Sequence, residues 1–457
     1  MYPLNICVVG TGYVGLTTGV CLAYLGHKVT CLDIDQNKIE QLQNGRVPIH
    51  EPNLAEALGV SRDNIRFTTD PSLAIADADV IFIAVGTPSL PDGNPDLQFV
   101  KAAGEQIGKH LRDGFTVVVN KSTVPIGSAN WVDTVIRDSY EVSRGSKATG
   151  IFAVASNPEF LREGSALHDT LYPDRVVLGS DNPKALEVLY SLYRPIIEQS
   201  FAAPNFLPRP ESLGAVPVVT ANLTSAELIK YAANAFLSVK ISFANEVGIL
   251  AERVGADINQ VVRGIGLDSR IGNRFLQAGL GWGGSCFGKD TAALVATARE
   301  YNVCMRIVQA ARDVNYEQRE RVVAMLLSEL KILKGKTIGL LGLAFKPHTD
   351  DLRDAPAFDI GRRLLNRGAK VRAHDPVALA RARFEHAESG IQFCDAPEAV
   401  AEDADALILV TEWPQYQELR WNDLAASMRL PLIVDGRNCL ERSKLEHAGF
   451  RYLGMGA

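Results

Sequence analysis

NICVVGTGYVG, residues 5–15, decides the fold of the first part of the chain. An apolar run leads directly into three glycines in the pattern GxGxxG, and residues 13–25 have the composition of a helix. In this strand–turn–helix context Gly10 permits a tight turn, Gly12 lets the backbone approach a pyrophosphate, and Gly15 lets the helix pack on the sheet. Three glycines alone could mark only a turn, but this context predicts a dinucleotide site at the helix N-terminus.

The second apolar strand, residues 28–32, indicates which dinucleotide binds. It ends at Asp33, where a carboxylate accepts hydrogen bonds from ribose hydroxyls and repels a ribose 2′-phosphate. NAD is therefore favoured over NADP, with Asp35 as a second candidate for the acid.

Apolar strands continue to alternate with helical patterns, at residues 79–85, 116–120 and 152–155, and a second strand–glycine–helix unit begins at Lys336. This alternation predicts an α/β protein with two Rossmann-like, doubly wound parallel-sheet domains joined by a long central helix. The expected domains are 1–203, which binds NAD, 204–315, a helical dimerisation region, and 316–457. The last domain lacks GxGxxG and is expected to hold the nucleotide of the substrate.

The middle of the chain contains a proline-rich stretch and a long helix. Residues 203–218 hold four prolines and predict a loop or an interdomain connection. From Thr224 to Val254 there is no proline, so a helix capped by Thr224 or Ser225 would extend about 45 Å at about 1.5 Å per residue. Such a helix could bridge two domains or form a dimer face.

Composition excludes several classes of function. A net charge of −6 argues against a nucleic-acid partner. Seven cysteines without CxxC spacing and eight histidines without a ligand cluster indicate a reducing compartment and no metal site. The first residues do not resemble a signal peptide, and no apolar run is long enough for a membrane span. The expected location is the cytoplasm, without membrane contact.

The segment GWGGSCFGKD, residues 281–290, carries the strongest signal for catalysis. Cys286 follows a glycine-rich loop and precedes a helical pattern, and a helix N-terminus favours the thiolate. Asp290 lies four residues further, on the same helical face. The alternative is a buried structural cysteine, but the surrounding glycines favour an oxyanion-type site.

Three further patterns add polar groups. Lys230 and Asn234 have i, i+4 spacing within LIKYAANAF, where they could stabilise an oxyanion; an ordinary solvated lysine is the alternative. STVP, residues 122–125, and NPEFLREG, residues 157–164, each follow a strand, at the sheet edge where ligands bind. Each alone could be a strand-end turn.

Together these motifs resemble the UDP-glucose/GDP-mannose dehydrogenase family over nearly the whole chain, from GTGYVG through ELIKYAANAF and GGSCFGKD to LAFKPHTDDLRDAP and DGRN. The resemblance implies that Cys286 is the nucleophile and that five further side chains complete the catalytic set: Thr123, Glu159, Lys230, Asn234 and Asp290. One departure is Gly288, where many relatives carry proline or glutamine.

The resemblance also implies two sets of binding residues. Those implied for NAD are Gly10, Gly12, Tyr13, Val14, Gly15, Asp33, Lys38, Thr87, Thr123, Glu163, Lys289 and Arg353. Those implied for the nucleotide sugar are Glu159, Phe160, Leu161, Arg162, Glu163, Lys230, Asn234, Arg270, Phe275, Gly283, Lys346 and Arg437. Arg270 is expected to come from the neighbouring subunit of a homodimer or higher homo-oligomer.

The implied reaction is the oxidation of UDP-glucose to UDP-glucuronate with two NAD, through a thiohemiacetal and a thioester on Cys286. Such a product would suit polysaccharide synthesis. The nearest alternatives keep the chemistry but use GDP-mannose or a UDP-N-acetylhexosamine. The others are a two-electron NAD-dependent hydroxyacid dehydrogenase, which needs no cysteine, and a non-catalytic NAD sensor.

Overall fold

The computed structural model describes residues 3–90 and 92–456. The chain forms two compact units, one ending at Ala232 and the other beginning at Ala233, and each is described by itself. In the part of the chain that the structure describes, no helix combines the length and apolar composition that a membrane span requires.

The N-terminal unit is built on an eight-stranded sheet with the order β3-β2-β1-β4-β5-β6-β7-β8. The first six strands are parallel and follow the order of doubly wound nucleotide-binding sheets, whereas β7 runs antiparallel to β6. The strands are β1 (Asn5–Val9), β2 (Lys28–Leu32), β3 (Ile65–Thr68), β4 (Val80–Ile83), β5 (Thr116–Asn120), β6 (Phe152–Ser156), β7 (Val176–Gly179) and β8 (Val218–Ala221).

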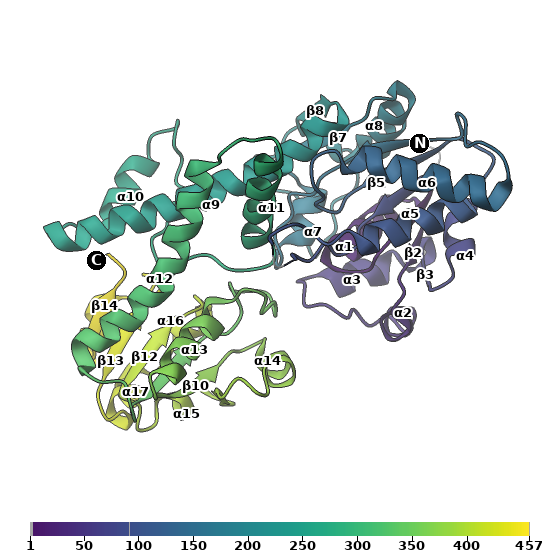
Figure 1. Ribbon diagram of the computed structural model, residues 1–457. Coiled ribbons are helices and arrows are strands. Elements are labelled where there is room, and N and C mark those ends of the chain that lie inside the picture. The colour runs from purple at the N-terminus through teal and green to yellow at the C-terminus, as the bar shows by residue number, and fades with distance from the viewer. Residues whose placement is uncertain (1–2, 91, 457) are drawn as a thin grey trace. The chain divides into compact units, whose positions relative to one another are not determined.

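Helices cover both faces of this sheet, so side chains on both faces of each inner strand are buried (Figure 1). In β1, Ile6 and Val8 join one apolar cluster while Cys7 and Val9 join the other. This explains why the strands are continuous apolar runs. One face packs against α1 (Tyr13–Tyr24), α2 (Gln36–Gln43), α3 (Leu54–Val60), α7 (Ala166–Leu171) and α8 (Pro183–Ile197), and the other against α4 (Pro71–Ile75), α5 (Gln98–His110) and α6 (Ser128–Arg144).

The proline-rich stretch is a loop within the N-terminal unit, so the first of its two interpretations is confirmed and the alternative, an interdomain connection, is not. The loop leaves α8 and leads into β8, which pairs with β7, so the sheet continues beyond residue 203. Aromatic side chains hold it in place: the Tyr172 hydroxyl donates to the Leu207 carbonyl at 2.8 Å, and the rings of Tyr172 and Phe201 stack.

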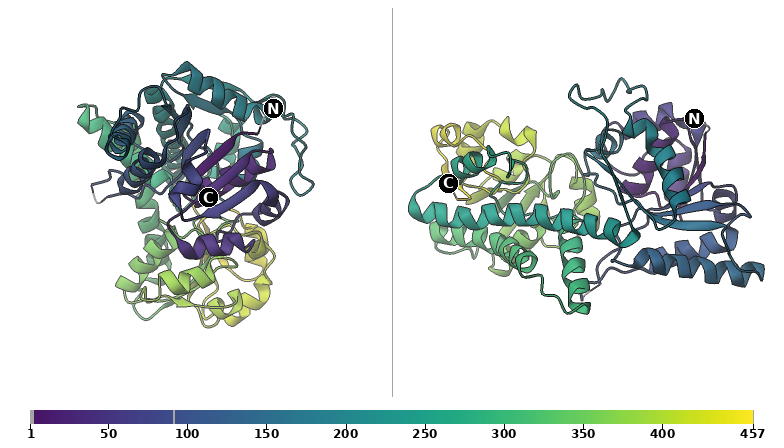
Figure 2. Two further views of the ribbon diagram at one scale, coloured as in Figure 1. Left: turned by 90° about the vertical axis from the view of Figure 1, so that its right-hand side faces the viewer. Right: turned by 90° about the horizontal axis from the view of Figure 1, so that it is seen from above.

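The predicted long helix is present as α9 (Leu223–Val254), uninterrupted over 32 residues (Figure 2). Its N-terminal cap is Asn222, whose Oδ1 accepts a hydrogen bond from the Ser225 amide at 2.8 Å. The expectation of a Thr224 or Ser225 cap was wrong, because the helix begins one residue earlier. The boundary between the two compact units falls within α9.

The C-terminal unit repeats the nucleotide-binding strand order in a six-stranded, fully parallel sheet, β11-β10-β9-β12-β13-β14. This confirms the second Rossmann-like domain. Its strands are β9 (Thr337–Leu341), β10 (Lys370–His374), β11 (Gln392–Phe393), β12 (Ala406–Leu409), β13 (Leu432–Asp435) and β14 (Arg451–Gly454). The helices that precede the sheet in the sequence are α10 (Ile258–Gly266), α11 (Phe287–Glu300) and α12 (Arg306–Leu330). The helices that alternate with its strands are α13 (Pro356–Asn366), α14 (Leu379–Glu385), α15 (Pro397–Ala401), α16 (Pro414–Gln417), α17 (Trp421–Ser427) and α18 (Arg442–His447).

Candidate active site

The glycine turn between β1 and α1 has the geometry that a dinucleotide requires. Gly10 has φ +100°, and a Cβ there would lie 2.6 Å from the Ala84 carbonyl oxygen. A Cβ at Gly15 would overlap the Gly10 carbonyl, whereas Gly12 faces open space. Because Gly12 is also the first residue before α1, whose first residues are Tyr13 and Val14, a pyrophosphate can approach its backbone and the helix N-terminus together. The residues present therefore fit a dinucleotide.

Asp33 lies at the end of β2 and braces this turn. Its Oδ2 accepts hydrogen bonds from the Thr11 amide at 2.8 Å and the Thr11 hydroxyl at 2.6 Å, and Oδ1 accepts from the Asp35 amide. Burial opposes ionisation, but these hydrogen bonds lower the pKa of Asp33 below its ordinary value. Asp35 instead caps α2 by accepting from the Lys38 amide, and the Lys38 ammonium lies 3.9 Å from its carboxylate. The geometry thus places Asp33, rather than Asp35, at the turn.

Asp33→Asn is expected to narrow the preference for NAD over NADP by roughly tenfold or more. The substitution removes a charged acceptor for ribose hydroxyls and the repulsion of a 2′-phosphate, and a hydrogen bond to a charged group contributes about 1.5–3 kcal/mol. Steady-state kcat/KM for both cofactors would measure the change. Asp35→Asn serves as the control, and an unchanged cofactor ratio in Asp33→Asn would contradict the assignment.

The turns after β4, β5 and β6 meet at the carboxyl edge of the sheet. The Thr87 hydroxyl donates to the Thr123 carbonyl at 2.9 Å, and the Ser122 hydroxyl donates to the Val85 carbonyl at 2.7 Å. The Asn157 amide donates to the Asn120 carbonyl at 3.0 Å. The two motifs that sequence placed after separate strands are therefore neighbours at one edge.

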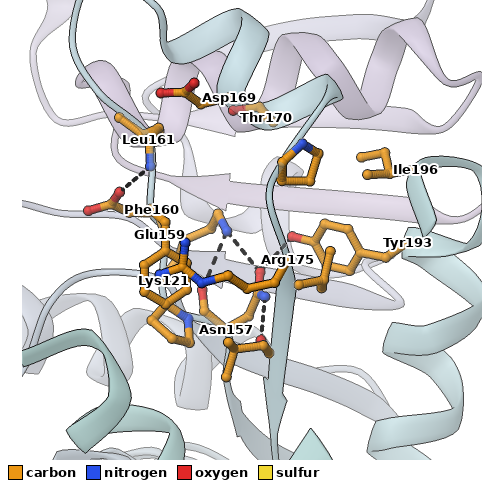
Figure 3. Close-up of a pocket in the computed structure, with 14 residues that line it drawn as sticks. Lys121, Asn157, Glu159, Phe160, Leu161, Asp169, Thr170, Arg175, Tyr193 and Ile196 are labelled. Atoms are coloured by element: carbon orange, nitrogen blue, oxygen red, sulfur yellow. Dashed lines mark hydrogen bonds between the residues drawn. The ribbon is translucent and has the colours of Figure 1, made fainter. Parts of the chain in front are cut away.

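Glu159 and Lys230 form a buried ion pair in the N-terminal unit. Lys230 Nζ lies 2.8 Å from Glu159 Oε1, and the two side chains are only 5% and 7% exposed. The other carboxylate oxygen accepts from the Leu161 amide at 2.9 Å, and the ammonium lies 5.4 Å from the centre of the Phe160 ring. The structure thus brings together four residues predicted for the sugar site, and Figure 3 shows three of them.

The rest of the NPEFLREG loop is anchored by acids. Arg162, predicted to bind substrate, is engaged by Asp169, which accepts from its amide, Nε and Nη2 at 2.7–2.9 Å. Glu163 follows in the same loop. Beyond it, the Glu51 carboxylate accepts from the amides of Gly164 and Ala166 at 2.7 Å.

A second buried glutamate, Glu227 of α9, anchors the other loop. Its carboxylate accepts from the Gly127 amide at 2.6 Å and the Ala129 amide at 2.9 Å, where the segment after Thr123 enters α6. Neither Glu51 nor Glu227 was predicted as a site residue. Sequence gives no signal for such roles, because each glutamate reaches a segment about 100 residues away.

In the C-terminal unit, Cys286 stands immediately before α11 as its N-terminal cap residue. This confirms the predicted helix N-terminus, where the dipole favours a thiolate. The Ser285 hydroxyl lies 3.5 Å from Cys286 Sγ, and the Asp290 amide donates to the Cys286 carbonyl at 2.8 Å.

Asp290 contacts two other residues that were predicted for the site. Its Oδ2 accepts a hydrogen bond from Asn234 Nδ2 at 2.6 Å, and its Oδ1 lies 3.0 Å from Lys289 Nζ. Asp290 and Asn234 are buried, at 1% and 8% exposure. The carboxylate therefore fixes which way the Asn234 amide points and leaves its second N–H for another acceptor.

Helix α12 supports the cysteine loop through residues that sequence reasoning missed. Asn315 accepts from the Trp282 amide at 2.7 Å and donates to the Trp282 carbonyl at 3.0 Å. Arg319 Nη2 also donates to that carbonyl, and Arg312 donates to the carbonyl of Gly288 and the hydroxyl of Thr291 at 2.7 Å. The spacing 312, 315, 319 places all three on one helical face, but it does not reveal that this face is buried.

Asn315→Ala is expected to destabilise the cysteine loop by about 1–3 kcal/mol, because the buried Trp282 amide loses its acceptor while the Trp282 carbonyl keeps only Arg319 as a donor. Hydrogen exchange of the peptide covering residues 281–290 should accelerate accordingly. Gln318→Ala is the matched control, since neither polar atom of that buried side chain has a hydrogen-bond partner in the part of the chain that the structure describes. Equal acceleration in both variants would contradict the role of Asn315.

Glycines and Arg437 fix the same loop from the other side. A Cβ at Gly283 would overlap the Asp354 carbonyl oxygen, so only glycine fits there. Arg437 donates to the carbonyls of Gly281, Phe345 and Val410 at 2.7–3.3 Å. Arg437, predicted to bind substrate, thus holds backbone segments of its own unit. The departure at Gly288 is also confined, because a Cβ there would lie 3.2 Å from the Asp354 carboxylate.

The remaining predicted residues are spread over the C-terminal unit. Arg270 is 87% exposed and pairs with Asp268, and Arg353 pairs with Asp351 at 2.8 Å. Phe275 has φ +64°, and its ring centre lies 6.1 Å from that of Phe287. Lys346 Nζ lies 5.5 Å from the centre of the Phe345 ring.

A Rossmann-type cofactor turn in the N-terminal unit is typical of a dinucleotide-dependent oxidoreductase, and the C-terminal unit carries a cysteine at a helix N-terminus. Family models agree with this class. Residues 4–197 match the NAD binding domain of the UDP-glucose/GDP-mannose dehydrogenase family, residues 224–317 its central domain, and residues 339–442 its UDP binding domain. The chain belongs to the UDP-glucose/GDP-mannose dehydrogenase family, and NAD is its cofactor.

Individual relatives cover the whole chain. UDP-glucose 6-dehydrogenase TuaD of Bacillus subtilis is 44% identical over 99% of this chain and 93% of its own, and a UDP-glucose 6-dehydrogenase of Pseudomonas aeruginosa is 45% identical over 99% and 97%. A UDP-glucose dehydrogenase structure from Pyrobaculum islandicum aligns with a TM-score of 0.88 at 38% identity, covering 100% of this chain and 98% of that one. A UDP-D-ManNAc dehydrogenase structure from Pyrococcus horikoshii aligns at 0.83 and 27% identity over 99% of both.

Proposed function

We propose that the protein oxidises the primary alcohol of UDP-glucose to the carboxylate of UDP-glucuronate, using two NAD and one water. The observation that carries the proposal is Cys286 at the N-terminus of α11, one helical turn from an Asp290 that is hydrogen-bonded to Asn234. Full-length relatives at 40–45% identity named as UDP-glucose 6-dehydrogenases support the choice of sugar. GDP-mannose and acetamido sugars are the nearest alternatives.

Bound NAD supplies the hydride acceptor for both oxidations. The glycine turn would hold its pyrophosphate and Asp33 its ribose. Further contacts carried over from the family would come from Lys38, Thr87, Thr123, Glu163, Lys289 and Arg353. In the first oxidation the alcohol loses a hydride and a proton, and a water held by Lys230 and Asp290 takes the proton.

The Cys286 thiolate then forms a carbon–sulfur bond to the aldehyde, and the carbonyl electron pair moves onto oxygen. Asn234 and Lys230 donate hydrogen bonds to this oxyanion. Loss of a second hydride collapses the oxyanion to a thioester. Water attacks the thioester, the carbon–sulfur bond breaks and the thiolate leaves, with Glu159 accepting a proton from the water and Thr123 assisting. Covalent capture prevents release of the aldehyde.

We also propose a role for each domain: residues 1–203 bind NAD, residues 204–315 carry the cysteine and the dimer helix, and residues 316–457 bind the UDP moiety. Asp375, after β10, corresponds to the acid that binds ribose in a dinucleotide domain. It is 1% exposed, and its oxygens accept from the amides of Leu343, Ala344, Val377 and Ala378 and from Trp413 Nε1. Because five donors already occupy its two oxygens, Asp375 is not expected to bind the ribose of a second NAD. The match of residues 339–442 to the family's UDP binding domain supports UDP here, with Lys346 and Arg353 as the contacts implied by the family.

A homodimer through α9 completes the proposal. Phe236, Phe243, Leu250 and Val254 are 50–66% exposed and recur every four or seven residues along the helix. An exposed apolar stripe of this kind is typical of an interface. Arg270, 87% exposed, then contributes to the neighbouring subunit's substrate site, as the family implies. Larger assemblies and a location in the cytoplasm remain predictions of the sequence.

The proposed function is tested by counting NADH released from limiting UDP-glucose. We expect two NADH per sugar. One NADH per sugar would contradict the four-electron reaction and indicate a two-electron dehydrogenase. No NADH would overturn the choice of sugar, and GDP-mannose and the acetamido sugars would then be tried in the same assay. Cofactor binding without turnover on any of them would indicate a sensor.

A further inference from the structure

Lys121, between β5 and the STVP motif, is a buried lysine to which the proposed mechanism gives no role. Its side chain is 7% exposed, and Nζ donates to Asn157 Oδ1 at 2.8 Å and to the Asn157 carbonyl at 3.4 Å. Together with Glu159, Lys121 lines a pocket of about 50 Å³ behind the NPEFLREG loop (Figure 3). Burying an ammonium is costly unless it is paired or hydrogen-bonded, so a buried lysine is expected to have a specific role.

Several charged and titratable groups surround the Lys121 ammonium. Burial lowers the pKa of Lys121 to about 8, Glu159 opposes this change, and Lys230 adds to it. Lys121 Nζ lies 5.9 Å from the centre of the Tyr193 ring, the Cys21 thiol interacts with it electrostatically, and Asp169 and Arg175 line the same pocket. Glu159 therefore lies near two buried ammonium groups: Lys230 contacts it at 2.8 Å, and Lys121 lines the same pocket.

We propose that Lys121 is a positioning residue that keeps Glu159 ionised while Lys230 is engaged at the substrate oxygen. The proposal rests on the proposed function, in which Lys230 donates to the oxyanion and Glu159 accepts a proton from water. Once Lys230 also donates to the oxyanion, its single positive charge is shared between two anions, and the Glu159 carboxylate keeps only part of its counter-charge in a buried site. A carboxylate in that position takes up a proton unless another cation remains nearby. Lys121 is that cation.

Asn157 explains why Lys121 stays fixed during such a change. Its Oδ1 also accepts from the Tyr193 hydroxyl at 2.6 Å, and its Nδ2 donates to the Val177 carbonyl at 2.8 Å. The NPEFLREG turn is thus held by hydrogen bonds that do not need the charge of Lys121. This separation between shape and charge makes the proposal testable.

The test compares Lys121→Gln, Lys121→Arg and Tyr193→Phe. Glutamine can still donate to Asn157 but carries no charge, arginine keeps the charge, and Tyr193→Phe removes a structural hydrogen bond and leaves the charge. The measurements are kcat against pH and the mass of acid-quenched protein, which reports the acyl group on Cys286. If Lys121→Gln does not fold, Lys121→Met replaces it.

In Lys121→Gln the acidic limb of the kcat–pH profile is expected to move to higher pH by about one pKa unit. At pH values below that limb, kcat should therefore fall roughly tenfold. The acyl-enzyme should accumulate, because hydrolysis needs the ionised base. Lys121→Arg and Tyr193→Phe should keep the limb of the unaltered protein. An unmoved limb in Lys121→Gln, or the same shift in Tyr193→Phe, would overturn the proposal.

The two proposals fail in different ways. If the unaltered protein releases two NADH per UDP-glucose while the Lys121→Gln limb stays in place, only the role of Lys121 is lost. If the unaltered protein releases no NADH from any nucleotide sugar, the proposed function is lost and the role of Lys121 falls with it.

Discussion

Cys286→Ser is expected to lower kcat for acid formation by roughly 10³-fold or more. A serine hydroxyl at the start of α11 is not ionised near neutral pH, so the aldehyde is captured poorly and the second hydride loss is blocked. The fold should be unaffected, since the two side chains differ by one atom. Any NADH formed should stop at or below one per sugar.

The measurement is NADH released from limiting UDP-glucose, followed in a single turnover and at steady state. Cys304→Ser is the matched control, because Cys304 is exposed and lies just before α12, away from the cysteine loop in sequence. Two NADH per sugar at an undiminished rate from Cys286→Ser would remove the covalent mechanism.

Asn234→Ala should lower kcat by about 10²–10³-fold, the usual cost of removing one oxyanion donor. In the structure Asp290 orients the amide at 2.6 Å, so the donor is already in place before the charge develops. KM for UDP-glucose should change much less than kcat, because the lost interaction is strongest in the transition state.

Asn245→Ala, on the same helix, provides the control for this substitution. Asn245 is 1% exposed and its Oδ1 accepts from the Gly279 amide at 2.7 Å, so its loss should cost stability rather than rate. Comparable kcat losses in the two variants would show that the effect of Asn234→Ala is structural. A higher KM with unchanged kcat in Asn234→Ala would also contradict the oxyanion role.

Local pattern was sufficient to predict much of the fold. The strands β2 and β5 begin and end at the predicted residues, because each is a largely apolar run bounded by glycine or polar residues. The strand predicted at 79–85 was too long, because only Val80–Ile83 pairs with the neighbouring strands β1 and β5. The proline-rich loop shows the limit: nothing near residue 203 signals that the chain returns to add β8 to the sheet.

In the candidate site, too, features set by local sequence could be predicted, whereas contacts between distant segments could not. Asp290 beside Cys286 follows from helical spacing, and Lys230 beside Glu159 was expected only from the family resemblance. The engagement of Arg162 by Asp169, the clamp of Asn315 on Trp282 and the burial of Lys121 depend on packing between distant segments. A charged residue directly after the uncharged strand TVVVN, whose three central residues are valine, was the one available signal for Lys121.

Asp33 and Asp375 occupy equivalent places, and the difference between them matters for protein engineering. Asp33 braces its turn mainly through Thr11, so redesign of cofactor preference can begin with single substitutions at that strand end. Asp375 supports five separate donors from two turns and a tryptophan. Mutating it would dismantle the scaffold before it altered any ligand preference, so libraries aimed at new nucleotide sugars are better directed at the loops than at this aspartate.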